Sequence, residues 1–369
     1  MKKKRKYLFN PRLLLCTSIL SLTIAVSAQT VKDTRTWTES YKVTDETTLE
    51  VENKYGTILI VPWNKDSVQV TADIFLEAKN TAKLRKLKND LRITSSDTRT
   101  YILVRTLIGE GNSRVASELR TLSNTLSNQS TVEINYTVYL PEYINLILNN
   151  KFGDIYIDDI NGDVDISLSN GVLKANSFSG NSNLELVFAK GTIHHLGTST
   201  LNMSYAELNL GSVEQLDLAS KSSELDIKTA GIVKMDSRRD KLILGEVEYL
   251  FGNSSFTDIT VKNFIREADC EMKFGTLNID NIQADYSRID INSDYTDITL
   301  YFPRECNYFV DILHHENAVV NLPETNAKLT TRKTGEEFLT TEGVIGEGDS
   351  EKRLIIKAEH KCYINILTR

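Results

Sequence analysis

The chain has 369 residues, of which 43 are Lys or Arg and 50 are Asp or Glu, so its formal net charge is −7. An acidic chain is poorly suited to bind nucleic-acid phosphates or an anionic membrane surface, because like charges repel. Its length is sufficient for two domains or for one long array of structural repeats.

Residues 1–28 have the three parts of a secretory signal peptide. A basic head at residues 2–6 is followed by an apolar stretch at 13–26, and Val26-Ser27-Ala28 places small residues where a signal peptidase cuts. This apolar stretch is shorter than the roughly 20 residues that a membrane-spanning helix needs. We therefore expect cleavage after Ala28, a net charge of −13 in the remaining chain, and export to the periplasm, the outer cell surface or the medium. An uncleaved N-terminal anchor is the alternative.

Residues 29–148 predict a β-rich N-terminal unit. Apolar residues alternate at positions 68, 70, 72 and 74, which is the period of two of a half-buried strand. Leu84, Leu87 and Leu91 then have the spacing of one helix face, with Asn80 or Thr81 as the N-cap. The pattern therefore predicts strands with one short helix between them. Residues 109–130 break the β pattern, and the two alternatives for this stretch are a weak helix and a long loop.

From residue 149 to 300 the chain becomes periodic. Pairs of the form apolar–x–apolar recur, and every second pair begins about 17 residues later, as at Leu208, Leu225 and Leu242. Strands this short cannot bury an apolar face alone, but stacking equivalent strands buries all of them. The pattern predicts a parallel β-solenoid (β-helix) with coils of about 17 residues, and a β-sandwich is the alternative. Residues 301–369 are expected to form a β cap that closes the array.

One motif recurs within the periodic pattern: an aromatic residue, a small residue, any residue, and then apolar–x–apolar. It occurs at 55–60, 152–157 and 274–279, with looser copies that begin at Tyr205, Tyr286 and Tyr295. Together with the signal peptide and the VYLP sequence at 138–141, it resembles the bacterial "putative adhesin" β-helix proteins of the Bacteroidetes type, a domain of unknown function. The resemblance implies the fold and the exported location, and it brings no catalytic residues with it.

The sequence contains no convincing catalytic, cofactor-binding or metal-binding motif. Adjacent histidines, as at 194–195 and 314–315, point to opposite faces of a strand and cannot readily share one metal. The acidic residues at 158, 159, 163, 290, 294 and 297 lie at turns, where Asp usually bonds the local backbone, and the nonapeptide repeat of calcium-loaded β-rolls is absent. We therefore expect a protein that is not an enzyme and has no cofactor.

Tyr205, Tyr286 and Tyr295 occupy expected corners of the repeat and are the candidate ligand-facing residues. Ring stacking that only stabilises the corners is the alternative interpretation. The favoured function is a surface interaction module that presents an extended face to a protein or glycan. The alternatives are a periplasmic structural or envelope-stress signalling accessory and, least favoured, a polysaccharide-active enzyme. A disulfide between Cys306 and Cys362 and buried free thiols are both compatible with the sequence.

Overall fold

The computed structural model describes residues 30–109, 130–348 and 350–369. In this part of the chain, 23 strands belong to one long, mostly parallel sheet that does not close on itself, and α2 (Thr81–Asp90) is the single helix. The prediction of an all-β chain is therefore confirmed. Over the described residues, no helix has the length and apolar character needed to cross a bilayer.

The strands form two rows that face each other, which we call row A and row B. Row A begins with β8 (Asn145–Lys151), β10 (Val164–Ser169) and β12 (Ser182–Val187), and row B with β9 (Ile155–Ile157) and β11 (Val172–Phe178). The strands that follow are long enough to run through both rows around a bend: β13 (Lys190–Ser204), β14 (Glu207–Lys221), β15 (Glu224–Arg238), β16 (Lys241–Ile279) and β17 (Arg288–Phe302). We call one row A segment and the row B segment that follows it a unit.

Successive units pair in parallel, and each residue pairs with its equivalent in the next unit. Leu184 pairs with Leu201, and Leu201 pairs with Leu218. Ile166 likewise pairs with Leu184, in a unit that is one residue longer. This register places equivalent residues beside one another along the whole array, which explains why the apolar pairs recur at a fixed spacing in the sequence.

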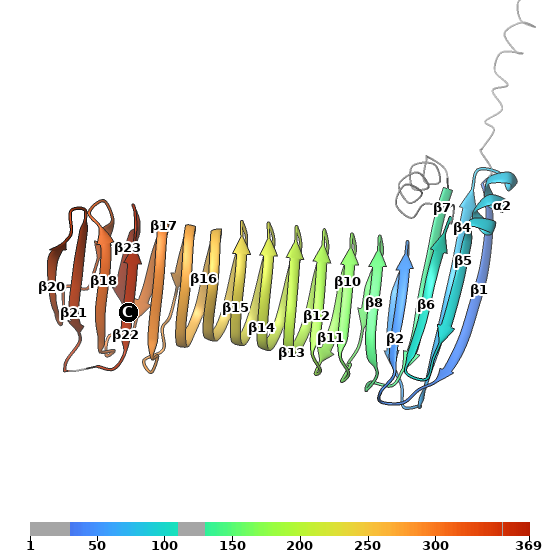
Figure 1. Ribbon diagram of the computed structural model, residues 1–369, viewed down its shortest axis with the longest axis horizontal. Coiled ribbons are helices and arrows are strands. Elements are labelled where there is room, and N and C mark those ends of the chain that lie inside the picture. Colours follow the sequence, from blue (N-terminus) through green and yellow to red (C-terminus); the bar gives the residue numbers. More distant parts are fainter. Residues whose placement is uncertain (1–29, 110–129, 349) are drawn as a thin grey trace, which may run out of the picture.

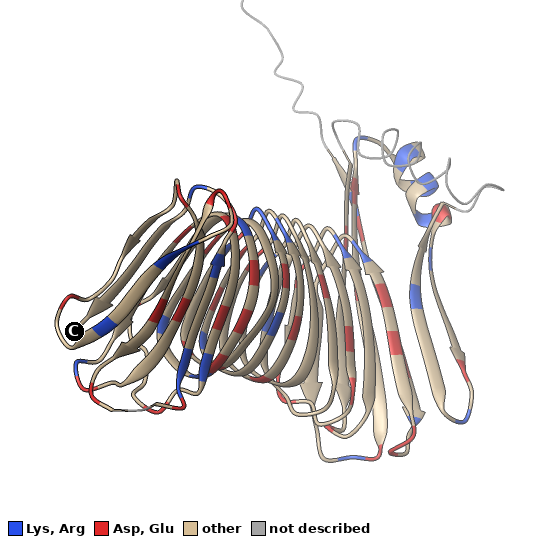
Figure 2. Cartoon of the chain, turned by 60° about the vertical axis from the view of Figure 1, so that its left-hand side comes forward, with Lys and Arg blue, Asp and Glu red and all other residues tan. Residues whose placement is uncertain are grey.

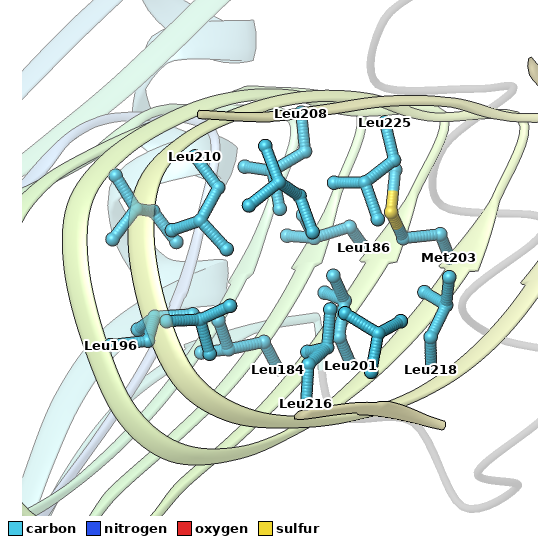
Figure 3. Close-up of a cluster of buried hydrophobic side chains, with 14 of the residues drawn as sticks. Leu184, Leu186, Leu196, Leu201, Met203, Leu208, Leu210, Leu216, Leu218 and Leu225 are labelled. Atoms are coloured by element: carbon cyan, nitrogen blue, oxygen red, sulfur yellow. The ribbon is translucent and has the colours of Figure 1, made fainter. Parts of the chain in front are cut away.

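The core lies between the two rows. Along each strand, buried and exposed residues alternate, because successive side chains of a strand point to opposite faces. Leu184, Leu201 and Leu216 from row A point toward Leu208 and Leu225 from row B (Figure 3). Each buried leucine contributes roughly 1.5–3 kcal/mol, so the ladders of such residues provide most of the stabilisation. Cys270, Cys306 and Cys362 are free thiols inside this core.

At the N-terminal end, the order of strands in space differs from their order in the sequence. β2 (Thr48–Lys54) lies between β6 (Tyr101–Ile108) and β8 (Figure 1). β3 (Ile58–Pro62) likewise pairs with β7 (Ser130–Leu140) on one side and with β9 on the other. Antiparallel strands then cover the end: β5 (Leu91–Asp97) on β6, β4 (Ser67–Ala78) on β7, and β1 (Val31–Lys42) on β4. Helix α2 follows β4, and the Asn80 side chain caps it as predicted by accepting a hydrogen bond from the Lys83 amide at 2.9 Å.

The C-terminal end shows the same kind of exchange. β22 (Arg353–Ala358) lies between β17 and β18 (Tyr308–His315), and β23 (Tyr363–Thr368) lies between β17 and β19 (Val319–Asn321). The last strands of the sequence are therefore inserted into the array (Figure 1). β21 (Phe338–Ile345) and β20 (Ala327–Thr334) pair antiparallel beyond β18 and cover row A.

Candidate functional site

The bend from row A to row B carries one residue per unit in the left-handed backbone conformation. We call this set of residues the corner ladder. In spatial order it consists of Tyr55, Phe152, Asn170, Phe188, Tyr205, Ser222, Arg239, Phe256, Phe274 and Tyr295, all with φ between 50° and 66°. The left-handed conformation costs a residue other than glycine about 1–2 kcal/mol, so a continuous series of such residues requires compensating interactions.

Ring stacking supplies this compensation at one part of the ladder. Phe256 stacks on Phe274 with ring centroids 4.7 Å apart, and Phe274 stacks on Tyr295 at 5.2 Å, with interplanar angles of 9° and 3°. His360, in the turn between β22 and β23, continues this stack at 4.9 Å from Tyr295. Each aromatic pair contributes about 0.5–1.5 kcal/mol beyond the area that it buries.

Between Tyr55 and Phe256, residues without an aromatic ring interrupt the ladder at two places. Asn170 separates the pair Tyr55–Phe152, whose rings stack at 5.6 Å, from the pair Phe188–Tyr205, whose rings stack at 5.0 Å. Ser222 and Arg239 separate Tyr205 from Phe256. The Arg239 guanidinium lies 5.8 Å from the centroid of the Phe256 ring and so covers the end of that stack.

From Phe152 to Tyr295, the ring-bearing residues of the ladder are 41–59% exposed. Phe274 and Tyr295, with a ring on both sides, are 41% and 46% exposed, and the residues that end their stacks are 46–59% exposed: Phe152, Phe188, Tyr205 and Phe256. Inside a stack only the ring edges are free, because the faces are covered by neighbouring rings. Among the described ladder residues, uncovered ring faces lie beside the interruptions, and at the Ser222 and Arg239 interruption the open face is that of Tyr205, because Arg239 covers the Phe256 ring.

A buried carboxylate holds the backbone at the Ser222 and Arg239 interruption. Asp240 is only 5% exposed. Its carboxylate accepts hydrogen bonds from the hydroxyls of Ser220 and Ser237, both at 2.6 Å, and from the backbone amides of Ser223 and Arg238 at 2.7 and 2.8 Å. Bonds to an ionised acceptor are about twice as strong as neutral ones, so this network replaces the ring stacking that is missing here.

A row of charged residues runs beside the ladder, two positions further along each unit. Lys190 forms an ion pair with Glu207 at 2.5 Å, and Lys241 forms one with Glu224 at 2.6 Å. These hydrogen bonds raise the pKa of both lysines above the usual range. Acidic and basic residues are also mixed along the rest of the array (Figure 2). The charged row therefore offers hydrogen-bonding groups of both kinds.

The ladder and the charged row together line an open groove of about 730 Å³. The groove extends from Phe188 to Asp258 and is centred on the interruption at Ser222 and Arg239. Rings, carboxylates and cationic groups thus meet at one place on the surface. Such a combination suits a ligand that has both an apolar face and a polar rim.

Two of the three tyrosines that the sequence singled out lie in the ladder, and the third does not. Tyr205 and Tyr295 are exposed and stacked. Tyr286 is 1% exposed and packs against Phe302 and Tyr308 in the core, so the expectation that it faces a ligand is wrong. The motif around Tyr286 leads into a row A segment rather than a row B segment, which puts its ring at the opposite bend and turns it inward.

Sequence reasoning left out Phe188 and Phe256 as candidate site residues. Phe188, Tyr205, Ser222, Arg239 and Phe256 follow one another along the sequence at a constant step of one unit. Extending that step in both directions from Tyr205 would have found the two phenylalanines and the two residues between the stacks. The small residue of the motif also has a clear role, since a Cβ on Gly153 would lie 2.0 Å from the Gly56 carbonyl oxygen of the adjacent unit.

The histidines and acidic turns are engaged in local hydrogen bonds. His194 Nδ1 lies 2.8 Å from the Asn176 side chain, and His195 Nδ1 lies 2.8 Å from the Ser212 hydroxyl. Asp163 accepts from the Asn181 amide, and Asp294 lies 2.6 Å from His360. In the described part of the chain, no group of three or more His, Cys, Asp or Glu residues is placed to hold a metal ion.

No protein-family model and no curated protein matches this sequence. Solved structures similar to it include a "putative adhesin" from Parabacteroides distasonis, with 10% identity, 72% of this chain and 96% of that chain covered, and a TM-score of 0.31. A "putative cell adhesion protein" from Clostridium sporogenes has 10% identity and a TM-score of 0.17, with 91% of this chain and 100% of that chain covered.

A "putative lipid binding protein" from Parabacteroides distasonis has 11% identity and a TM-score of 0.31, with 70% of this chain and 96% of that chain covered. Two of these three structures have names that refer to adhesion.

Proposed function

We propose that this chain is an exported, non-enzymatic interaction protein of the cell envelope that binds a glycan at the corner ladder. The observation that carries the proposal is the groove at the interrupted ladder, where exposed ring faces lie beside carboxylates and cationic groups. The sequence pattern of a signal peptide in residues 1–28 supports export, and these residues lie outside the described part of the chain.

The proposed architecture is a β-solenoid at 149–300 between two β caps at 29–148 and 301–369. The parallel register supports the solenoid, because each residue pairs with its equivalent one unit along the chain and each unit then covers the previous one. Antiparallel strands beyond β7 and β18 support the assignment of the ends as caps. A rod of this kind offers a long exposed corner and an open groove for binding.

A glycan fits the chemistry of the groove better than an apolar ligand. A sugar ring has an apolar C–H face that can pack on an aromatic ring, and its hydroxyls both donate and accept hydrogen bonds. Tyr205 provides an exposed ring, and Glu207 and Glu224 provide acceptors within the same groove. Each of these carboxylates already accepts from a lysine and keeps 46% or more of its side-chain surface exposed. A purely apolar ligand would displace the water on that surface without replacing its hydrogen bonds, at a cost in binding free energy.

The test is a binding screen of the purified protein against arrayed glycans, followed by titration of each glycan that binds. We expect saturable binding and about tenfold weaker affinity for Tyr205→Ala, which corresponds to the loss of one stacking contact of about 1.4 kcal/mol. Tyr363→Ala is the matched control, since Tyr363 is 42% exposed but lies on β23 outside the ladder. No binding to any glycan by the wild-type protein would disprove the proposal.

A further inference from the structure

We propose that the interruption at Ser222 is a subsite for one hexopyranose ring, held between the Tyr205 ring and the Arg239 guanidinium. This inference rests on the proposed function and makes it specific, because it identifies one position of the ladder as the place where a sugar inserts. The remaining rings of the ladder would then position this subsite rather than contact the ligand.

The spacing of the ladder sets the size of the subsite. Ser222 lies one unit from Tyr205 and one unit from Arg239 in the parallel register. Neighbouring strands are about 4.8 Å apart, so Tyr205 and Arg239 lie on strands about 10 Å apart. Rings at adjacent ladder positions have centroids 4.7 Å apart in Phe256–Phe274 and 5.6 Å apart in Tyr55–Phe152. A single six-membered ring at the Ser222 position would therefore continue the stack on both sides.

The groups around Ser222 match the two surfaces of a sugar ring. Among the described residues, no other ring covers the face of Tyr205 that is turned away from Phe188, and Tyr205 is 51% exposed. Arg239 contacts the Phe256 ring but has no ion-pair partner among the residues that the structure describes. Its five N–H donors are suited to sugar hydroxyls and the ring oxygen. The Glu224 carboxylate lies two residues after Ser222 and can accept from a hydroxyl at the rim.

The chemistry favours a sugar ring over an aromatic side chain of a protein partner. An aromatic side chain would stack equally well on Tyr205, but it has no hydroxyls for the carboxylates of Glu207 and Glu224. Both carboxylates keep 46% or more of their side-chain surface exposed despite their ion pairs. A ligand that covered them without donating hydrogen bonds would lose affinity.

The second interruption provides a comparison within the same molecule. Asn170 also lies between two rings, Phe152 and Phe188, in the same backbone conformation as Ser222. Phenyl rings flank it on both sides, with no guanidinium, and Asn170 is not part of the groove lining. The two positions therefore share the missing ring but differ in the polar groups, and only Ser222 has the set that a sugar needs.

The decisive variant is Ser222→Tyr, which fills the missing position with the residue that occurs naturally one unit away. Ser222 and Tyr205 both have φ of 52°, so a tyrosine is compatible with the backbone at residue 222. We expect the variant to fold and to melt at a temperature at least equal to that of wild type. The matched control is Asn170→Tyr, which fills the other interruption at a position that is not part of the groove lining.

Affinities would be measured by calorimetry with neutral gluco-, galacto- and manno-oligosaccharides, and with N-acetyl-tryptophanamide as the aromatic probe. We expect Ser222→Tyr to weaken oligosaccharide binding at least tenfold, Arg239→Ala to weaken it severalfold, and Asn170→Tyr to leave it unchanged. The aromatic probe is expected not to compete.

Each contrary result has a separate meaning. Wild-type affinity in Ser222→Tyr would overturn the subsite while the proposed glycan function stands. Loss of binding in Asn170→Tyr alone would also overturn it, by moving the site to the other interruption. Competition by the aromatic probe would show that the position takes a protein side chain. If the wild-type protein binds no oligosaccharide, the proposed function itself fails.

Discussion

The corner ladder has two stretches with the same backbone conformation and different means of support. From Phe256 to His360 the rings form a continuous stack, whereas from Phe152 to Arg239 the stack is broken twice. The broken stretch relies on the buried Asp240 carboxylate and has the groove beside it. The comparison indicates that stacking stabilises the corner, and that the open groove lies where stacking stops.

The largest effect is expected from removing the carboxylate that supports the interrupted stretch. Asp240→Ala would leave the buried hydroxyls of Ser220 and Ser237 without their acceptor. We expect the free energy of unfolding to fall by about 2–4 kcal/mol, since hydrogen bonds to charged groups are the stronger ones. Urea unfolding measures this change. Asp236→Ala, at an exposed position of the preceding strand β15, is the control and should change it by no more than about 0.5 kcal/mol.

A result in which both aspartate variants behave alike would mean that Asp240 does not stabilise the bend. The conservative variant Asp240→Asn separates charge from shape, because it keeps one carbonyl acceptor. We expect its stability to lie between those of wild type and Asp240→Ala.

A smaller effect is expected within the continuous stack, where a ring contacts two neighbours. Phe274→Ala removes two stacking contacts, and Phe188→Ala removes one. At about 0.5–1.5 kcal/mol per contact, we expect the loss of stability for Phe274→Ala to be roughly twice that for Phe188→Ala. Thermal and urea unfolding of the two variants measure the ratio. Equal losses would contradict the view that the two stretches differ in stacking.

The smallest effect concerns the core behind the continuous stack. Burial raises the pKa of the Cys270 thiol from 9.0 to about 12. Because the folded-state pKa is raised, the neutral thiol stabilises the fold fully below pH 9, and this contribution is lost as the pH rises toward 12. Since only the thiolate is alkylated, we expect Cys270 to resist iodoacetamide at pH 8 in the folded protein and to react after unfolding. Mass spectrometry of timed samples measures this.

The same reaction can report on the ladder. Cys270 lies on the row A segment that ends at Phe274. If the continuous stack keeps this row A segment in place, Phe274→Ala should raise the rate at which Cys270 is alkylated. Phe188→Ala, in the interrupted stretch, should leave that rate unchanged. Equal rates of Cys270 alkylation in both variants would mean that the local unfolding that exposes this thiol does not involve the ladder.

Much of the central array could be predicted from the sequence, because its contacts follow a simple rule. Leu208, Leu225 and Leu242 are one unit apart in sequence and adjacent in space, so local periodicity carries the three-dimensional information. The same rule fails at the ends. That β22 and β23 insert beside β17 depends on pairing between segments far apart in sequence, and no repeat spacing in the sequence indicates it.

The candidate site shows the same limit at the level of single residues. Tyr205, Tyr286 and Tyr295 begin copies of one motif, yet Tyr286 is buried and the other two are exposed. Which bend a tyrosine occupies depends on the row that its segment joins, and the motif is the same in both cases. Sequence reasoning could therefore place rings at corners without deciding which corner faces the solvent.

By itself, the sequence determined the all-β class, the length of the repeating unit and the apolar residues of the core, since the alternation of side chains and the unit length are local properties of the chain. Only the tertiary structure decided the insertion of the last strands, the burial of Tyr286, and the meeting of Tyr205, Arg239 and Glu224 in one groove. These features depend on the register between units, which is set by packing of the whole array and not by any one segment.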